Sequence, residues 1–531
     1  MTDNALQQTA VKQPVVWCIG GIDSSGGAGI TRDAITLADL KVHACVITTQ
    51  ATVQSNTVML SKESMTASAL NQQWQVLSES TQASAIKIGA IANDEQALLL
   101  CARIQSLAMP RPFVVWDPVL RTSSGGKLSE LSEPVVDALL NTVDLVTPNT
   151  QELSWLTNMP VKTDDSLRAA AYQLIENGAH AVYVKGGHAS WQTQACDTFV
   201  SPTQTIQFIQ PRKNTGKLRG TGCMLASAIA AFVVHDYCIE DALTLANAYV
   251  SQVRSDSCLS SVHTPATNTY EARTYTPAFG RCIGFPRNPA SFPLVKFSPR
   301  EPLATQTFSL DAEKAPLPQS NTVISPFKPL TQTHLGLYPV VDSVEWIERL
   351  LPTGTNIIQL RVKQGTQEDI RQQIKEAIAL TKHTHCQLFI NDYWELAIEL
   401  GAFGVHLGQE DIDTADLHTI RKAGIRLGIS THGFAEIQRV RQLKPSYIAL
   451  GHIFPTNTKE MPSKPQGIER LSKYVELCED IPTVAIGGIN LARIADVAKT
   501  GVSGIAVVSA ITQVDDPLHA FYALSKEAGF A

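Results

Sequence analysis

The sequence predicts an α/β fold class for the whole chain, with a mostly parallel sheet in the first half and a (β/α)8 TIM barrel in the second. Two observations lead to this prediction. Short β-branched runs alternate with helical stretches along both halves, and a proline-rich segment separates them. The 531 residues also exceed what one hydrophobic core usually organises, since domains hold about 100–200 residues.

Composition narrows the class of protein further. The hydrophobic content of 44% is that of globular domains, and the net charge of −6 argues against nucleic acid as a partner. The ten cysteines contain no pair with zinc-site or redox-site spacing. We find no apolar run that approaches a membrane span and no signal-like apolar core near residue 1. We therefore expect a reduced, cytoplasmic protein that does not bind membranes.

The proline-rich segment sets the predicted domain boundaries. Nine of the 28 prolines lie between Phe285 and Pro329, where regular structure is expected to fail because proline fixes φ and lacks an N–H. We predict an N-terminal tail over 1–13, a first domain over 14–275, a linker over 276–333 that packs in part on a neighbour, and a second domain over 334–531.

Six buried strands are predicted in the first domain, at 15–20, 44–49, 84–89, 113–117, 143–148 and 181–186. Eight are predicted in the second, at 337–341, 356–361, 387–391, 403–407, 425–429, 446–451, 481–486 and 503–508. Eight βα units in about 200 residues describe a compact barrel. A doubly wound sheet is the alternative for this half.

Polar residues follow most of the barrel strands, at the end where barrel chemistry takes place. Arg361, Lys363 and Lys459 bring positive charge. Asp392 and Asp411 offer hard oxygen ligands for Mg²⁺, and Gly488, Val508 and Ser509 form the expected phosphate cradle after strands seven and eight. Any single one of these residues is more often a solvated cap, but seven loops converging on one face favour a site for two phosphorylated substrates.

These barrel motifs carry a resemblance. QLRVK, IND, GVHLGQED, GISTH, GHIFPTNTK, AIGGI and AVVSAI, in this order, resemble thiamine-phosphate synthase from Leu335 to the C-terminus. The thiazole tautomerase shares the barrel and cradle but lacks the full diphosphate and metal set, so the intact motifs favour the synthase.

The resemblance implies roles for individual residues. Arg361, Lys363 and Asn391 would hold hydroxymethylpyrimidine diphosphate, Asp392 and Asp411 would bind Mg²⁺, and Ser430 and Lys459 would contact the diphosphate-bearing substrate. The thiazole phosphate would be held by Thr456, Asn457, Thr458, Gly488, Val508 and Ser509.

In the first domain the stretch GTGC (220–223) opens an apolar helix where a side-chain cap would be usual. Unpaired N–H groups and the helix dipole favour an anion there, and the glycines allow its close approach. We expect the same dipole to lower the pKa of Cys223 toward a thiolate. A lone buried cysteine is usually only a small hydrophobe, but the flanking glycines favour function.

Two further motifs follow predicted strands. SSGGAGI (24–30) is glycine-rich but matches neither the P-loop nor GxGxxG. TPNTQE (147–152) offers Asn149 and Glu152 as ligands of Mg²⁺, directly or through water, although the same spacing also describes a capping box.

GIDSSGGAGI, KIGA, WDPV, TPNTQE, VKGGH and GTGC together resemble the ribokinase-like hydroxymethylpyrimidine (phosphate) kinases over about residues 14–260. The resemblance implies an α/β sandwich in which Cys223 lies against the reacting hydroxymethyl group. Gly21, Asp33 and Gln54 match the pyrimidine-binding positions; Asn149, Glu152, Lys185, Gly220 and Gly222 would serve Mg-ATP. Two positions depart from the family pattern: Arg219 replaces a histidine and Ser123 a lysine.

The two resemblances predict a fusion of successive steps in thiamine biosynthesis, with ATP as phosphoryl donor and Mg²⁺ as cofactor. Small molecules are the expected partners: hydroxymethylpyrimidine, its phosphate and diphosphate, thiazole phosphate and ATP. A homodimer through the kinase half is the one assembly we allow for. Two alternatives concern the first half, which could be a pyridoxal-type kinase or a non-catalytic pyrimidine sensor attached to an active synthase.

Overall fold

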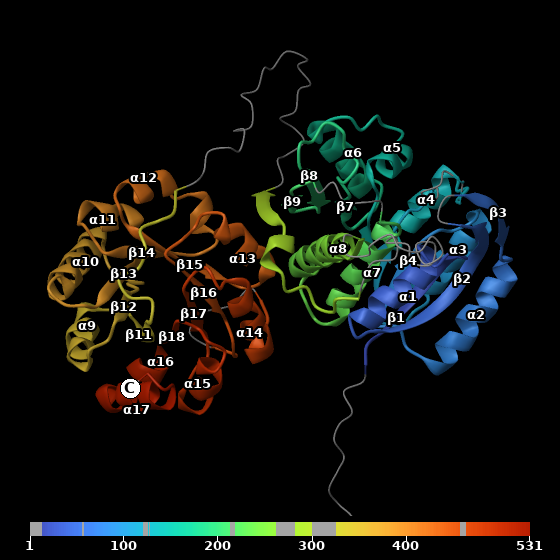
Figure 1. Cartoon of the computed structure of the whole chain (residues 1–531). Helices are drawn as coiled ribbons and strands as arrows, with labels where there is room; N and C mark the ends of the chain where they lie inside the picture. Colours follow the sequence, from blue (N-terminus) through green and yellow to red (C-terminus); the bar gives the residue numbers. More distant parts are fainter. Residues whose placement is uncertain are drawn as a thin grey trace, which may run out of the picture. The chain divides into compact units, whose positions relative to one another are not determined.

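The computed structural model describes residues 13–55, 58–120, 126, 128–212, 218–261, 282–299, 325–456 and 463–530, with backbone only for 257–261. The chain forms two compact units, Met1–Phe308 and Ser309–Ala531 (Figure 1). Among the described residues, no helix is both long and apolar enough to cross a membrane.

The first unit is built on a ten-stranded sheet with the strand order β10-β9-β8-β7-β6-β5-β4-β1-β2-β3. The strands are β1 (Val15–Asp23), β2 (His43–Gln54), β3 (Met59–Ser64), β4 (Ala85–Ile88), β5 (Phe113–Trp116), β6 (Leu145–Val146), β7 (Val182–Val184), β8 (Ala195–Val200), β9 (Gln204–Gln210) and β10 (Leu294–Pro299). The six predicted strands form the parallel centre from β7 to β2. Antiparallel strands extend both edges, so the prediction of a mostly parallel sheet is confirmed.

Helices cover both faces of this sheet (Figure 1). They are α1 (Gly29–Asp39), α2 (Ala67–Ser80), α3 (Asp94–Gln105), α4 (Glu133–Leu140), α5 (Thr150–Thr157), α6 (Asp164–Glu176), α7 (Thr221–Val234) and α8 (Ile239–Ser261). Helix α7 packs against α1, α8, β4 and β5. Ala226, Ala228, Ala230 and Ala231 are all fully buried in it, and these small side chains let its neighbours approach on every side.

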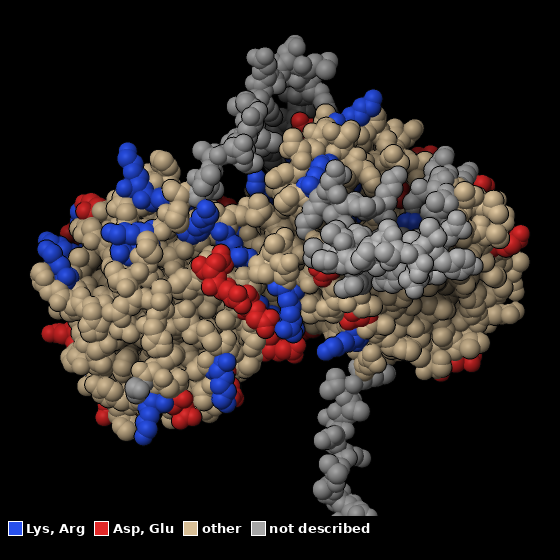
Figure 2. Space-filling view, in the orientation of Figure 1, with Lys and Arg blue, Asp and Glu red and all other residues tan. Residues whose placement is uncertain are grey.

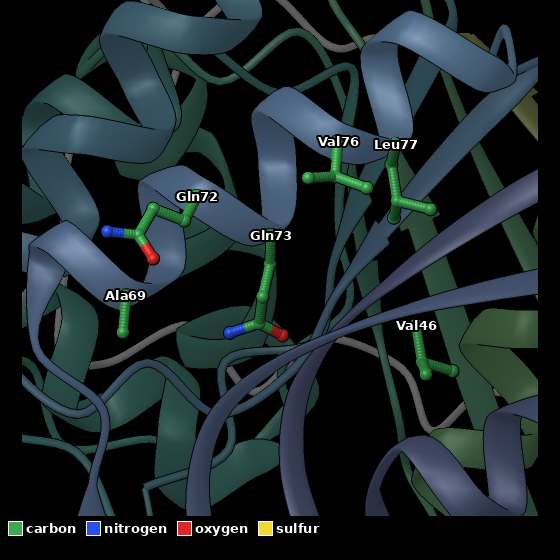
Figure 3. A pocket seen from close by; sticks show the side chains of 6 residues that line it. All are labelled: Val46, Ala69, Gln72, Gln73, Val76 and Leu77. Atoms are coloured by element: carbon green, nitrogen blue, oxygen red, sulfur yellow. The ribbon is translucent and has the colours of Figure 1, made fainter.

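The outer edge of β2 is closed by a side chain. Strand β3 pairs with β2 only from Gln50 onward, and before that point Gln73 of α2 exchanges hydrogen bonds with the backbone N–H and C=O of Thr48. Beside it lies a depression of about 450 Å³ between β2 and α2, lined by Val46, Ala69, Gln72, Gln73, Val76 and Leu77 (Figure 3). Its lining contains no charged residue, so it does not have the chemistry of a phosphate site.

Regular structure forms within the range predicted as a linker. A 3-10 turn, η3 (Pro289–Ser291), precedes β10, which pairs with β9 as an edge strand. Proline is compatible with both positions, because Pro289 begins the turn and Pro299 ends an edge strand. Composition alone therefore overstated the irregularity of this segment.

The second unit is a closed barrel of eight parallel strands, as predicted. The strands are β11 (Gly336–Val341), β12 (Ile357–Leu360), β13 (Gln387–Asn391), β14 (Gly404–Leu407), β15 (Arg426–Thr431), β16 (Tyr447–Gly451), β17 (Thr483–Ile486) and β18 (Gly504–Val507). Pairing of β18 with β11 closes the barrel. Its helices are α9 (Val344–Leu350), α10 (Gln367–Thr381), α11 (Trp394–Glu399), α12 (Leu417–Lys422), α13 (Phe434–Arg441), α14 (Gly467–Leu477), α15 (Leu491–Ala498), α16 (Ser509–Thr512) and α17 (Pro517–Glu527).

Aromatic rings fill the barrel because glycines on neighbouring strands make room for them. A Cβ at Gly404 would lie 2.3 Å from the Phe389 ring, and one at Gly428 would lie 2.2 Å from the Tyr447 ring. The two rings meet edge to face, with centroids 5.0 Å apart. Side chains thus fill the interior of the barrel, and substrates can be bound only at its mouth.

Charged side chains of both signs are interspersed on the visible face of the barrel unit, where uncharged residues cover most of the surface (Figure 2). This pattern agrees with the modest net charge of −6.

Candidate active sites

Two glycine-rich loops meet at the start of α7. Gly220 is the N-cap of this helix, has φ 69°, and makes no side-chain cap bond. A Cβ on Gly220 would lie 2.2 Å from the carbonyl oxygen of Gly27, so the GTGC and SSGGAGI loops touch at a distance that only glycine allows. The first N–H groups of α7 therefore have no side-chain partner at the cap and can face an anion.

A cation lies beside these loops. Lys185 Nζ is 2.6 Å from Asp117 Oδ1 and 3.5 Å from Glu152 Oε2. A Cβ on Gly222 would lie 3.4 Å from the same Nζ. Burial disfavours the charge on Lys185, but the neighbouring carboxylates outweigh it and raise the pKa of this ammonium. The structure therefore brings Glu152, Lys185 and Gly222 together at the start of α7.

Asn149 and Glu152 form the capping box that their spacing allowed. Asn149 Oδ1 accepts from the N–H groups of Gln151 and Glu152, and Glu152 Oε2 accepts from the Asn149 N–H. Burial raises the pKa of Glu152, although Lys185 opposes this effect. The motif thus shapes the loop structurally at the same time as it borders Lys185.

The expectation of a low pKa for Cys223 is wrong. Burial raises the pKa of this thiol to about 11, and Lys87 and the Gly29 N–H only partly offset it. Cys223 as a residue is only 9% exposed, and desolvation of a thiolate there outweighs the dipole of one helix. Cys223 is a neutral thiol beside the site, not a thiolate.

Asp33 lies beneath the site rather than on its surface. It is fully buried, with Oδ2 2.8 Å from Lys87 Nζ and Oδ1 accepting from the Ser227 hydroxyl. Burial opposes the charge on Lys87, but Asp33 outweighs it and raises the pKa of the ammonium. We infer that Asp33 acts by holding Lys87, because both of its oxygens are already bonded.

Gln50, which the sequence analysis did not single out, lies against Gly21. The two residues pair across β1 and β2, and a Cβ on Gly21 would lie 3.2 Å from Gln50 Cγ. Gln50 is fully buried, its Nε2 donates to the Leu128 carbonyl, and its Oε1 has no hydrogen-bond partner among the described residues. Gln54 is half-buried at the end of β2, where its N–H donates to Ser24 Oγ.

Of the two positions that depart from the kinase family pattern, Arg219 and Ser123, the structure describes only Arg219. Arg219 is buried, lies 3.2 Å from Asp23, and donates to Ser25 Oγ and to the Ser55 carbonyl. It therefore ties the end of β1 and the loop after β2 to the start of α7. Ser123 lies outside the described residues.

In the barrel, Arg361 and Lys363 follow β12, Asn391 ends β13 and Asp392 follows it. Asn391 is buried, whereas Lys363 and Asp392 are exposed. Asp392 has φ 66°, and its N–H donates to the carbonyl of His406 on β14. The left-handed backbone turns the chain just beyond the strand, at the barrel mouth.

Asp392 and Asp411 fit a magnesium ion by their chemistry. Both follow neighbouring strands, β13 and β14, and neither is buried. Asp411 Oδ2 accepts from the Gly408 N–H, which fixes the carboxylate in its loop. Two carboxylates suit an ion that keeps several waters and takes further oxygens from a phosphorylated ligand.

Ser430 is held from two sides at the end of β15. His406 Nε2 lies 2.8 Å from its hydroxyl, and Gln409 Nε2 donates to its carbonyl. Burial, together with Arg361, lowers the pKa of His406 to about 3. His406 itself was not predicted, because a histidine inside a barrel strand cannot be told from a packed one by sequence.

Two of the three expected phosphate loops are in contact. Gly488 has φ 63°, and a Cβ there would lie 2.4 Å from the Pro455 carbonyl, so the loop after β17 contacts the loop containing Thr456. Val508 caps α16, which Ser509 begins. Asn457, Thr458 and Lys459 lie outside the described residues.

The folds and sites define a chain of two phosphate-handling α/β units, one a ribokinase-like sheet and one a TIM barrel. Residues 331–511 match the family model described as thiamine monophosphate synthase, and residues 23–266 match that described as phosphomethylpyrimidine kinase. The chain is 57% identical over 197 residues to a thiamine-phosphate synthase of Proteus mirabilis, covering 37% of this chain and 90% of the relative. It is 60% identical over 182 residues to one of Escherichia coli, covering 34% and 86%.

A crystal structure of a phosphomethylpyrimidine kinase from Clostridium difficile is also similar, at 25% identity and a TM-score of 0.40, covering 45% of this chain and 99% of that chain. The chain belongs to the thiamine-phosphate synthase family through its barrel, fused to a domain of the phosphomethylpyrimidine kinase type.

Proposed function

We propose that this chain carries out successive steps of thiamine biosynthesis. The first unit converts hydroxymethylpyrimidine to its diphosphate with ATP, and the barrel joins that diphosphate to thiazole phosphate. The observation that carries the proposal is the pairing itself, because the product of the first family's reaction is a substrate of the second. A cytoplasmic location stays a prediction.

In the kinase unit, the hydroxymethyl oxygen attacks the γ-phosphorus of ATP, ADP leaves, and the hydroxyl proton passes to solvent. The second transfer repeats this with an oxygen of the new phosphate. We assign stabilisation of the transferred phosphoryl group to the N–H groups at Gly220–Cys223 and to the Lys185 ammonium, and the glycine N-cap of α7 and the nearby lysine support this assignment. We assign Asn149, Glu152 and Gly222 to the Mg-ATP side, and Gly21 and Gln54 to the pyrimidine side, with Asp33 beneath them as the residue that holds Lys87.

In the barrel, the C–O bond to diphosphate breaks and the thiazole nitrogen lone pair forms the new C–N bond. The departing diphosphate needs positive charge rather than a general base. We assign this positive charge to Arg361, Lys363 and Lys459. Mg²⁺ held by Asp392 and Asp411 would add to this charge. Thiazole phosphate would occupy the loops of Thr456–Thr458, Gly488 and Val508–Ser509.

The test uses the purified full chain. Hydroxymethylpyrimidine, ATP, Mg²⁺ and thiazole phosphate are supplied, and thiamine phosphate is measured by mass spectrometry. We expect product with all four and none when any one is omitted. A second reaction supplies the pyrimidine diphosphate directly. Product only in that second reaction would remove the kinase assignment and leave a sensor or another vitamin kinase, which pyridoxal phosphorylation would reveal.

A further inference from the structure

We propose that a hydrogen-bonded chain across the barrel interior fixes the Ser430 hydroxyl as a donor to an anionic oxygen of the substrate, with Tyr447 and His406 as positioning residues. This inference rests on the proposed synthase function, because it concerns the same site. It adds two residues that act through Ser430 and gives the direction in which each proton of the chain points.

The chain starts in the aromatic core and ends at the barrel mouth. Gln359 Nε2 donates to the Tyr338 hydroxyl at 3.2 Å, and the hydroxyls of Tyr338 and Tyr447 are 2.9 Å apart. The Tyr447 hydroxyl lies 2.7 Å from His406 Nδ1, and His406 Nε2 lies 2.8 Å from Ser430 Oγ. Tyr338 and Tyr447 are at most 1% exposed, so water does not reach these hydroxyls.

The direction of the protons follows from their donors. The Gln359 amide nitrogen can only donate, so the Tyr338 hydroxyl accepts there. The Tyr447 hydroxyl is the other group within hydrogen-bond distance, and the buried Tyr338 proton is satisfied only if it is donated to it. Tyr447 must then donate to His406 Nδ1, because each phenol carries one proton. With Nδ1 accepting, the imidazole proton sits on Nε2 and is donated to Ser430 Oγ.

Ser430 thereby accepts a hydrogen bond from inside the barrel, and its own hydroxyl proton can be donated to an anion bound at the barrel mouth. Its carbonyl is held by Gln409, so backbone and side chain are both fixed before substrate arrives. A donor that is oriented in advance stabilises developing charge on a departing diphosphate without further ordering. The opposite order of protons would make Ser430 donate inward and present only lone pairs to the anion.

A double-mutant cycle in the full chain tests whether Tyr447 acts through Ser430. With pyrimidine diphosphate and thiazole phosphate supplied, we expect Ser430→Ala to lower kcat by about 10²–10³-fold. Tyr447→Phe should lower kcat by roughly tenfold with little change in KM, and should add less than about threefold in the Ser430→Ala background. Multiplication of the two effects would overturn the proposal.

Tyr474→Phe is the matched control, because Tyr474 is equally buried and donates to Gln466 Oε1, which is not part of the hydrogen-bonded network of Tyr447 and His406. We expect it to leave kcat unchanged. A cooperative thermal unfolding transition is the check that each variant is folded. If Tyr447→Phe does not fold, Tyr338→Phe takes its place in the cycle, with the same non-additivity expected and a smaller single effect.

Nitrogen NMR of ¹⁵N-histidine-labelled protein reads the proton positions without catalysis, with His406 assigned by the loss of its signals in His406→Gln. We expect a proton on Nε2 and none on Nδ1, and a shift toward the other tautomer in Tyr447→Phe. A proton on Nδ1 in the unmodified chain would overturn the proposal. If the chain makes no thiamine phosphate but shows the Nε2 tautomer, the synthase function fails and the proton order stands.

Discussion

Lys185 Nζ lies 2.6 Å from Asp117 Oδ1, and the Asp117 side chain is only 1% exposed. This buried pair links the end of β5 to the end of β7 beside the start of α7, and it explains why WDPV and VKGGH both belong to the kinase pattern. Asp117 and Glu152 keep this cation charged although it is buried, and the proposed role of Lys185 toward the ATP phosphates depends on that charge.

Replacing this lysine should damage the kinase unit alone. Lys185→Met leaves Asp117 buried without its ion-pair partner, so we expect a loss of roughly 3–5 kcal/mol in the unfolding free energy of this unit. Phosphorylation of hydroxymethylpyrimidine should fall by more than about a hundredfold.

Lys499→Met is the matched control, since the Lys499–Asp496 pair is exposed and worth little. Denaturant unfolding and a direct kinase assay measure both effects. Equal effects of the two substitutions would contradict the assignment. Coupling of supplied pyrimidine diphosphate should continue in both variants.

The contact between the two glycine-rich loops predicts the cost of one methyl group. Gly220→Ala places a Cβ 2.2 Å from the Gly27 carbonyl oxygen and forces a φ of 69° on alanine, so we expect the kinase rate to fall steeply. Gly401→Ala is the comparison, because Gly401 has φ 72° with open space around it and carries only the backbone strain of about 1 kcal/mol. Thermal unfolding of the two variants compares their losses of stability. A similar loss in both would mean that the contact between the two loops adds nothing to the backbone strain.

The neutral state of Cys223 predicts its reactivity. Because burial raises its pKa to about 11, the thiolate fraction should rise tenfold per pH unit throughout the range below that value. Alkylation by iodoacetamide, followed by mass spectrometry of the Cys223 peptide, should be slow at neutral pH and should still be rising at about pH 10.

The chain unfolded in urea is the control for Cys223, since its thiols should titrate near the ordinary value of about 8.5. A Cys223 rate that levels off by about pH 8 in the folded protein would restore the thiolate that the sequence first indicated.

The burial of Gln50 predicts a residue that selects the pyrimidine. Its Oε1 is buried beside Gly21 without a partner among the described residues, so an amino group of the substrate can donate to it. Gln50→Leu should raise KM for hydroxymethylpyrimidine by about 10–100-fold, since a polar contact is lost, and should leave KM for ATP unchanged. Gln54→Leu is the matched comparison, and a larger effect there would make Gln54, rather than Gln50, the residue that selects the pyrimidine.

The sequence allowed the barrel, the parallel centre of the first sheet and the order of the motifs to be predicted, because each rests on local periodicity and strand-end composition. It did not reveal β8, β9 and β10, whose pairing is set by contacts between distant segments. The pKa of Cys223 was misjudged for the same reason, since helix position is visible in the sequence and burial is not. Gln50 could not be singled out from the sequence, because only the register of β1 and β2 places it opposite Gly21, and the role of Gln54 stays a prediction.

Removal of single carboxylates at the barrel mouth should separate metal binding from folding. Asp411→Asn keeps an oxygen that can accept from the Gly408 N–H, so the loop should hold while the charge is lost. We expect the coupling reaction to require a much higher Mg²⁺ concentration and kcat to fall by at least about tenfold. Asp392→Asn should behave in the same way, because an exposed residue contributes little to stability.

Asp480→Asn offers the control for both carboxylates, since Asp480 is an exposed residue that pairs with Arg441 and precedes the amino end of β17, away from the barrel mouth. Titration of Mg²⁺ at fixed substrate concentrations, with thiamine phosphate as the readout, distinguishes these variants. If Asp411→Asn shows the Mg²⁺ dependence of the unmodified chain, Asp411 is only a structural cap of its own loop. In that case the ion would have to be held by Asp392 and the diphosphate. Asp392→Asn would then raise the required Mg²⁺ concentration much more than Asp411→Asn.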